Sequence, residues 1–225
     1  MLPEFMHLPV STGYILAGLF TCHPGAAPDV TLQFRNEPPV INHTRSSAYL
    51  LRMKKNSSSP PYGGAFPILD GITNGKMQMK YDIEFTGTEE TRSHQACVAA
   101  SAAHLVITYK PVIYISSNIL NGTCRYDATL DHEMKHVRTD IKTINEYIPD
   151  IREAAERALR HAQTARPVAS RDVDQLREDI SDELSKAVDE QSHALEKTRT
   201  TRQRGIDSAA EYTRLSHACP DERWR

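Results

Sequence analysis

Features that would assign this chain to several common protein classes are missing from its 225 residues. Its formal net charge is only -2, so it has no overall basic field that would favour nucleic acid as a partner. It contains no glycine-rich phosphate loop and no Gly-x-Ser-x-Gly motif, so nucleotide hydrolysis and serine hydrolase chemistry find no support. It also has no Cys-x-x-Cys pair, which argues against a zinc ribbon.

The N-terminal end lacks basic residues, since no lysine or arginine precedes Arg35. The apolar run at residues 10–20 has about 11 residues, far short of the roughly 20 that a membrane-spanning helix needs, so no transmembrane helix is expected. Small residues follow it, and the stretch resembles the apolar segment and cleavage region of a secretory signal without the usual basic start. We therefore expect residues 1–27 to be a leader and the protein to be secreted or periplasmic.

The cysteines also bear on whether the protein is secreted or cytosolic. Removal of the predicted leader would leave Cys97, Cys124 and Cys219, which permits one disulfide and one free thiol. Cys97 and Cys124 flank the strand-like block 104–116, so this pair is the expected disulfide. The alternative is a cytosolic protein with buried free thiols.

Residues 28–118 combine β-branched and aromatic residues with turn formers, as sheets do. Residues 95–103 fit either a short helix or part of a strand. This half is predicted to be a small, mostly antiparallel sheet. The predicted strands, which alternate or run apolar, cover residues 30–34, 47–53, 76–85 and 104–116.

Loops are predicted between these strands at residues 56–64 and 69–75, which are rich in turn formers. The second ends in the pair Asn74-Gly75, which is favoured in tight hairpin turns.

Helix formers replace strand formers from Tyr126 onward. Apolar residues recur at spacings of three and four over residues 130–148, as on one face of a helix. Pro149 is expected to break or kink this helix because it cannot donate to the carbonyl four residues back. The pattern resumes, stops near residues 164–172, and continues from Val173 as a second long helix.

Together these patterns predict an α+β fold, with an N-terminal mostly antiparallel sheet followed by an active-site helix and a long helical hairpin. One domain is expected over residues 28–219. Its sheet-rich part is 28–118 and its helical hairpin is 126–217, and residues 220–225 form a tail.

The stretch TLDHEMKHVRTD, residues 129–140, gives that helix its expected role. His132 and His136 are four apart, so on a helix both rings can direct a nitrogen at one Zn²⁺ ion. Glu133 then stands beside the position left open for water. In such a site the metal lowers the pKa of bound water toward about 7 and polarises a carbonyl, with Glu133 as the catalytic base. The alternative is a pair of surface histidines on a salt-bridged helix.

A strand, a short loop and a helix bearing this His-Glu-x-x-His motif resemble the zincin superfamily of zinc metallopeptidases. More narrowly, the layout is similar to a bacterial family of secreted domains described as zinc-dependent proteases of unproven function. Its members carry a sheet, a cysteine shortly before the motif helix, and a long helical return with an aspartate near its end. Cys124, the motif and the stretch 205–212 match in that order, so the resemblance covers about residues 76–219. It implies a zinc peptidase with a peptide or protein substrate.

The motif leaves the third metal ligand open. Thr139 and Lys142 stand where a metzincin has its glycine and third histidine, so that pattern does not apply. Asp140 is the nearest carboxylate on the same face, but on a straight helix it lies a turn too far along. If the hairpin turns near residues 167–168, antiparallel pairing sets the middle of the motif opposite roughly residue 201, with a turn or two of slack from a kink at Pro149.

Glu196, Asp207 and Glu211 fall within range of that position. Asp207 is the expected ligand, because it matches the late aspartate of the resembled family and follows Gly205, which would allow two backbones to approach closely. Glu211 could fix a histidine ring or be the ligand itself. Tyr212 could stabilise an oxyanion or simply pack. The alternative for these carboxylates is a solvated helix end.

The sequence thus predicts a secreted zinc-dependent peptidase with Zn²⁺ as cofactor. The block 104–116 is expected to be the edge strand that aligns the substrate by backbone pairing. The rival hypothesis is a non-catalytic cell-envelope interaction module built on the helical hairpin, with the histidines idle or holding a structural metal. A third is a metal-dependent hydrolase of a non-peptide amide such as cell-wall peptide. The oligomeric state is left open.

Overall fold

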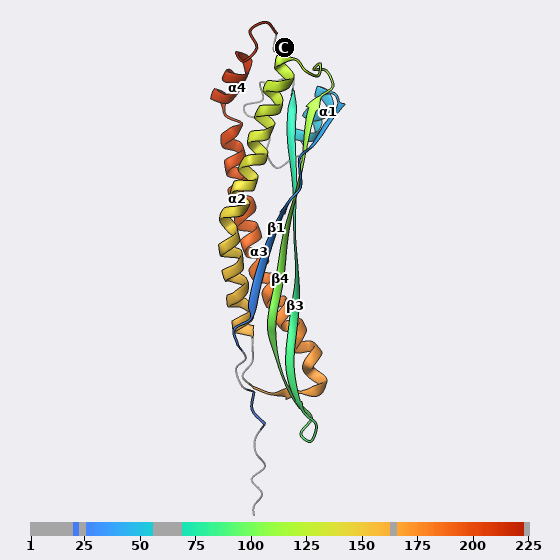
Figure 1. Cartoon of the computed structure of the whole chain (residues 1–225), viewed down its shortest axis with the longest axis vertical. Helices are drawn as coiled ribbons and strands as arrows, with labels where there is room; N and C mark the ends of the chain where they lie inside the picture. Colours follow the sequence, from blue (N-terminus) through green and yellow to red (C-terminus); the bar gives the residue numbers. More distant parts are fainter. Residues whose placement is uncertain (1–19, 23–25, 56–68, 163–165, 223–225) are drawn as a thin grey trace, which may run out of the picture.

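Two long strands and two long helices dominate the fold. β3 (Gly71–Glu90) and β4 (Gln95–Ser116) have 20 and 22 residues, and α2 (Cys124–Ala162) and α3 (Val173–Ile206) have 39 and 34. Figure 1 shows these elements running along the long axis of the molecule. The computed structural model describes residues 20–22, 26–55, 69–162 and 166–222.

Shorter elements accompany them. The sheet-rich first half followed by helices confirms the expected α+β class. None of the described helices is both long and apolar enough to cross a membrane. In chain order the shorter elements are β1 (Asp29–Asn36), β2 (Val40–Arg45), α1 (Ser47–Lys55), β5 (Val168–Ala169), a 3-10 helix (Ser170–Asp172) and α4 (Ala209–Ser216).

β4 is the central strand of one five-stranded sheet. β3 pairs with it antiparallel along its whole length. Along the other edge of β4, the strands β5, β1 and β2 pair in turn with residues 95–96, 102–109 and 112–116. β1 and β2 are parallel to β4, so the expectation of a mostly antiparallel sheet is wrong for both, and the sheet is mixed. Apolar alternation predicts a strand but not its direction, which depends on the edge to which the chain returns.

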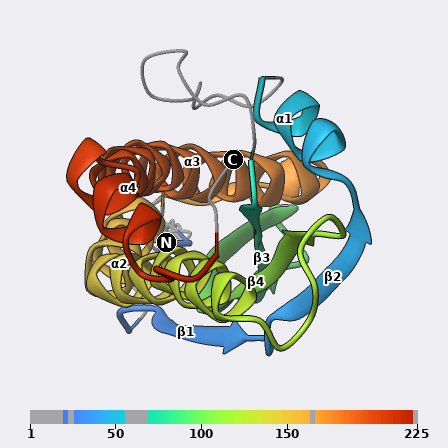
Figure 2. The same cartoon turned by 90° about the horizontal axis from the view of Figure 1, so that it is seen from above.

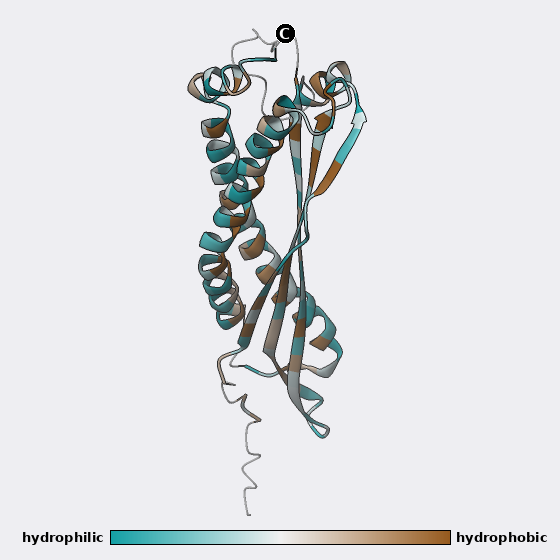
Figure 3. Cartoon of the chain, turned by 45° about the horizontal axis from the view of Figure 1, so that its top comes forward, coloured by the Kyte–Doolittle hydropathy of each residue, from teal (hydrophilic) through white to brown (hydrophobic). Residues whose placement is uncertain are grey.

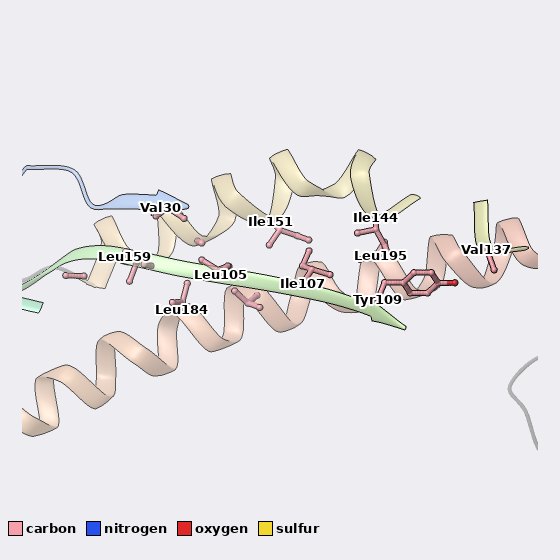
Figure 4. Close-up of a cluster of buried hydrophobic side chains, with 14 of the residues drawn as sticks. Val30, Leu105, Ile107, Tyr109, Val137, Ile144, Ile151, Leu159, Leu184 and Leu195 are labelled. Atoms are coloured by element: carbon pink, nitrogen blue, oxygen red, sulfur yellow. The ribbon is translucent and has the colours of Figure 1, made fainter. Parts of the chain in front are cut away.

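α2 and α3 cover one face of this sheet (Figures 1 and 2). Alternate side chains of β4 are buried toward them, among them Leu105 and Ile107. Figure 4 shows these side chains between Ile151 of α2 and Leu184 of α3. Brown and teal bands alternate along both helices in Figure 3, as expected when a helix buries one stripe and exposes the rest.

The predicted strand at 47–53 is wrong, because these residues belong to the helix α1. Leu50 is fully buried, and Met53 and Lys54 are partly buried on the same side. Their spacing of three and four residues is that of a helix face. The short apolar run could not distinguish the two structures by itself.

The predicted loop at residues 69–75 lies mostly within β3, and residues 95–103 belong to β4. The glycine at the end of that predicted loop has a packing role instead of a turn role. A Cβ on Gly75 would come within 2.5 Å of the Tyr109 ring, so only glycine fits there. The predicted loop at 56–64 lies outside the described residues.

Pro149 lies inside α2 without ending it, so of the two expected outcomes, a break or a kink, the break is wrong. Proline removes one backbone hydrogen bond from the helix. Ile144 and Ile151 on either side of it are fully buried in the core, and this packing holds the helix in one piece. The predicted helix end near residues 164–172 is confirmed, since α2 ends before this segment and α3 begins after it.

The disulfides differ from the expected pairing. Cys22 is bonded to Cys97 and Cys124 to Cys219, so the predicted bond between Cys97 and Cys124 and the predicted free thiol are both wrong. The two bonds lie at opposite ends of β4, because Cys97 is near its start and Cys124 begins the helix that follows it. Cys22 falls within the predicted leader, so the first bond requires that any cleavage occur before this residue. Two disulfides are compatible with a secreted protein.

Candidate metal centre

The structure brings His132, His136 and Asp207 together at the end of the molecule where α4 lies (Figure 1). The two histidines are one turn apart on α2, and their side chains are only 5% and 9% exposed. Asp207 caps the C-terminal end of α3 and precedes α4, so its carboxylate enters from the returning helix. One ring nitrogen of each histidine and one carboxylate oxygen face a common point.

The three facing atoms form a nearly equilateral triangle. The two histidine Nε2 atoms are 3.3 Å apart, and Asp207 Oδ1 lies 3.2 Å from Nε2 of His136 and 3.4 Å from Nε2 of His132. Zinc bound tetrahedrally at about 2.0–2.1 Å separates its ligand atoms by about 3.3 Å. An octahedral ion at similar bond lengths separates them by about 3.0 Å. The triangle therefore matches one face of a tetrahedron whose fourth corner carries no protein ligand among the described residues.

The other nitrogen of each ring shows where the ring protons lie. His132 Nδ1 is 3.2 Å from Glu211 Oε1, and His136 Nδ1 contacts Gln203 Oε1. Carboxylate and amide oxygens only accept hydrogen bonds, so both Nδ1 atoms carry a proton. A neutral ring protonated there presents a lone pair at Nε2. Two such lone pairs and a carboxylate oxygen repel one another unless a proton or a metal ion lies between them.

Glu211 lies behind the ring of His132, in one of the two places foreseen for it. It accepts hydrogen bonds from Lys135 at 2.6 Å and from two nitrogens of Arg214 at 2.7 and 2.8 Å. The hydrogen bonds from Arg214 are the largest cause of a pKa of Glu211 well below its usual range. An ionised carboxylate in this position fixes the orientation of a metal-binding histidine.

Asp207 is held by groups from two further helices. Its Oδ1 lies 3.3 Å from the hydroxyl of Tyr212 on α4, and its Oδ2 accepts a hydrogen bond from Lys54 of α1 at 2.8 Å. Burial alone would raise the pKa of Asp207, but hydrogen bonds with both histidines and the charge of Lys54 outweigh it and hold the pKa well below its usual range. The lysine engages one carboxylate oxygen and leaves the other facing the rings.

Gly205 does not have the expected role, since a Cβ there would meet no atom within 4 Å. The close approach occurs on β3, where a Cβ on Gly71 would lie 2.6 Å from Glu133 Oε1. On the same face of β3, the hydroxyl of Thr73 donates to Glu133 Oε2 at 2.8 Å. These contacts hold the buried Glu133 against the strand. The sequence did not predict roles for Gly71 and Thr73, because the turn-forming residues at 69–75 indicated a loop where β3 begins. The alternation of buried and exposed positions that starts at residue 71 is the signal that could have identified the strand.

The other candidate ligands lie elsewhere. Asp140 is buried in an ion pair with Arg199, with 2.6 Å between its Oδ2 and the nearest guanidinium nitrogen. Glu196 pairs with the same arginine and leaves 58% of its side chain exposed. Neither joins the group of atoms that could hold an ion.

The metal-free protein is expected to be less stable at about pH 8.5 than at about pH 6. Burial alone lowers the pKa of His136, but its hydrogen bond with Asp207 and the charge of Glu133 outweigh burial and raise the pKa above 6.5. A raised pKa stabilises the fold fully below the unfolded-state pKa, and this stability is lost as pH rises through the folded-state pKa. Urea unfolding of chelator-treated protein at both pH values measures the difference.

Zinc is expected to reverse this dependence. Zinc bound here would require unprotonated rings, so its stabilising effect would grow as pH rises. The same unfolding measurements in saturating zinc provide the comparison. An identical pH dependence with and without zinc would contradict a metal site at these two rings.

The resemblance to zincin metallopeptidases rests on the HEMKH segment and on the order of elements around it. No model of a known protein family matches the chain, and neither does any curated protein or solved structure.

Proposed function

We propose that this protein is a zinc-dependent peptidase that hydrolyses peptide bonds with Glu133 as general base. The observation that carries the proposal is the triangle of two Nε2 atoms and one Oδ1 atom at the spacing of tetrahedral zinc. His132, His136 and Asp207 would hold the ion. Three protein ligands leave one position for water or substrate, as in catalytic zinc sites.

The placement of Glu133 favours a catalytic site over a structural one. A structural zinc site closes with four protein ligands and needs no further carboxylate beside it. Glu133 is only 4% exposed, and burial of a carboxylate is costly unless it is compensated. The hydroxyl of Thr73 supplies part of that compensation. A buried carboxylate next to the ligand histidines is what a general base requires.

Each residue has a defined task in the proposed reaction. Zinc, when bound, would polarise the scissile carbonyl and activate the attacking water. Glu133 takes a proton from that water and delivers it to the leaving amine. Burial and the charges of Asp207 and Glu133 raise the pKa of Tyr212, so its hydroxyl stays protonated. The hydroxyl donates to Asp207 Oδ1 at 3.3 Å, and it would turn from that oxygen to donate to the carbonyl oxygen as negative charge develops there.

The strand that aligns the substrate is β3 in this proposal. The prediction that residues 104–116 form the edge strand is wrong, because β4 is paired along both of its edges. Among the described residues β3 pairs with β4 alone, so its second edge can accept an extended peptide. Thr73 ties β3 to Glu133, so a peptide paired near Thr73 would pass the metal centre.

The place of action is proposed to be outside the cytoplasm. Two disulfides, Cys22–Cys97 and Cys124–Cys219, form and persist in oxidising compartments. The predicted leader falls largely on residues 1–19, which lie outside the described residues. Its assignment stays a prediction.

The purified protein is expected to carry one zinc ion per chain and to hydrolyse an unfolded protein substrate. A chelator should abolish hydrolysis, and added zinc should restore it. His136→Ala should lose the zinc, whereas His104→Ala, which changes an exposed histidine of β4, should keep it. Elemental analysis and peptide release measure both properties. A chain that stays metal-free in excess zinc would overturn the proposal.

A further inference from the structure

Polar side chains face one another across the seam between α2 and α3, next to the metal centre. They are spaced four residues apart on each helix, which puts them on one face of each. Their contacts form three successive rungs. We call this set the polar ladder, and it consists of His132, His136 and Asp140 on α2, of Gln203 and Arg199 on α3, and of Asp207, which caps the end of α3.

We propose that the two rungs beyond the ligands position the metal site. Asp140 and Arg199 set the register of α2 against α3, and Gln203 sets the protonation site and orientation of the His136 ring. The inference rests on the proposed metal site, but it concerns residues that belong to neither the ligands nor the base. Gln203, Asp140 and Arg199 are thus positioning residues.

Gln203 contacts His136 twice. Its carbonyl oxygen accepts from the ring Nδ1, and its amide nitrogen donates to the backbone oxygen of His136 at 3.0 Å. The same amide nitrogen donates to Asp140 Oδ1 at 2.6 Å. Because a carboxylate can only accept, the bond to Asp140 settles which end of the amide faces the ring. The ring proton is therefore held on Nδ1, and Nε2 is left for a metal ion.

Asp140 is itself held from three directions. Arg199 donates to its two oxygens at 3.1 and 2.6 Å, and the hydroxyl of Tyr109 donates to it at 2.8 Å. Arg199 also donates to the backbone oxygen of Gly75 at 3.2 Å. Asp140 and Arg199 are 3% and 7% exposed, so water does not replace these bonds. Asp140 therefore links both helices to β3 and β4 and cannot turn away from Gln203.

The register of the hairpin depends on these buried polar contacts as well as on its apolar pairs. One helical turn beyond the pair of Asp140 and Arg199, the same register sets Ile144 of α2 opposite Leu195 of α3, and both are fully buried. A slide of one turn would set Gln191 or Arg199 opposite Ile144 in place of Leu195. The same slide would leave Asp140 and Arg199 buried without each other, which is strongly destabilising. Asp207 reaches the histidines only in the observed register.

Gln203→Met tests the role of the amide, because methionine has a similar volume and helix propensity but neither donates nor accepts strongly. Zinc affinity is expected to fall about 10–100-fold, as when the outer partner of a metal-binding histidine is lost. Gln175→Met, on the exposed side of the same helix, should leave the affinity unchanged. Competition with a chromophoric chelator measures both. Equal zinc affinity in Gln203→Met and the unaltered protein would overturn the inference.

Nitrogen NMR of the zinc-free protein reports which ring nitrogen of His136 carries the proton. Loss of packing alone would not change this protonation site. At about pH 8.5 the neutral His136 ring should be protonated at Nδ1 in the unaltered protein, and Gln203→Met should shift the proton toward Nε2. An unchanged ring would overturn the inference. A ring that behaves as expected in a chain that binds no zinc would overturn the peptidase proposal and support the positioning role.

Gln203→Glu is a second variant that keeps the acceptor. Its carboxylate can accept from His136 Nδ1 and can share one proton with Asp140. We expect it to retain both the Nδ1 proton and zinc binding, whereas Gln203→Met loses them. If the glutamate variant behaves like the methionine variant, the hydrogen bond to the ring is not what Gln203 contributes, and the inference is overturned.

Discussion

Replacement of Glu133 by glutamine is expected to slow peptide hydrolysis by about 10²–10⁴-fold while one zinc ion per chain is retained. Glutamine has the shape of glutamate but cannot take a proton from water. The hydroxyl of Thr73 can donate to the oxygen of glutamine as it does to Glu133 Oε2, so the side chain stays against β3. His132, His136 and Asp207 form their triangle without Glu133, so the ligands are unchanged.

Glu153→Gln is the matched control for this change. Glu153 lies on the same helix, and 65% of its side chain is exposed, so its loss should alter neither rate nor zinc content. The value of kcat and the zinc content are measured on the same preparations. Full activity in Glu133→Gln would exclude this residue as the base. Loss of zinc in that variant would instead place Glu133 among the ligands.

The helix that carries the motif could be predicted from the sequence, but only part of its buried face could, since Val137 and Ile144 of the expected apolar stripe are buried. Leu130, Met134 and Ile141 of the expected apolar stripe are only partly buried, whereas His132 and His136 are buried. Hydropathy assigns polar side chains to solvent. The two histidines and the Asp140–Arg199 ion pair are buried together with partners from another helix, and local periodicity carries no information about those partners.

The arrival of Asp207 at the histidines followed from the antiparallel hairpin, and the observed register differs from the simple count by one turn, within the one or two turns of slack expected from Pro149. Counting from a turn at residues 167–168 sets the middle of the motif opposite residue 201, whereas the observed contacts set it opposite residue 205. The count assumes a short turn. In the structure α2 ends at Ala162 and α3 begins at Val173, with β5 and the 3-10 helix between them. The pairing of β5 with β4 is a long-range contact that the sequence does not show.

Removal of the Cys124–Cys219 bond by two serine substitutions is expected to lower zinc affinity by at least about 10–100-fold. The bond ties the start of α2, which carries both histidines, to the segment after α4. α4 has eight residues, of which Leu215 alone is buried, so packing holds it weakly. A loosened α4 would withdraw Glu211 from the ring of His132 and free the chain on one side of Asp207.

The Cys22–Cys97 bond offers a matched control. The two bonds have sequence separations of 75 and 95 residues, so loop entropy gives each roughly 4–5 kcal/mol of unfolding free energy. Both double-serine variants should therefore lose similar stability in urea unfolding of the zinc-free protein. Only the variant at Cys124 and Cys219 should lose zinc affinity, measured by chelator competition without denaturant. Cys97 lies at the other end of β4, away from the metal centre.

Equal losses of zinc affinity in both variants would mean that global stability governs binding, and no loss in either would mean that other contacts hold α4. Such contacts exist, because Glu222 accepts from the backbone nitrogens of Cys124 and Arg125 at 3.0 and 3.2 Å. They depend on the same C-terminal segment, however, and that segment is anchored by Cys219. The expected contrast follows from where each bond lies. One holds the chain that delivers two carboxylates to the histidines, and the other holds the N-terminal edge of the sheet.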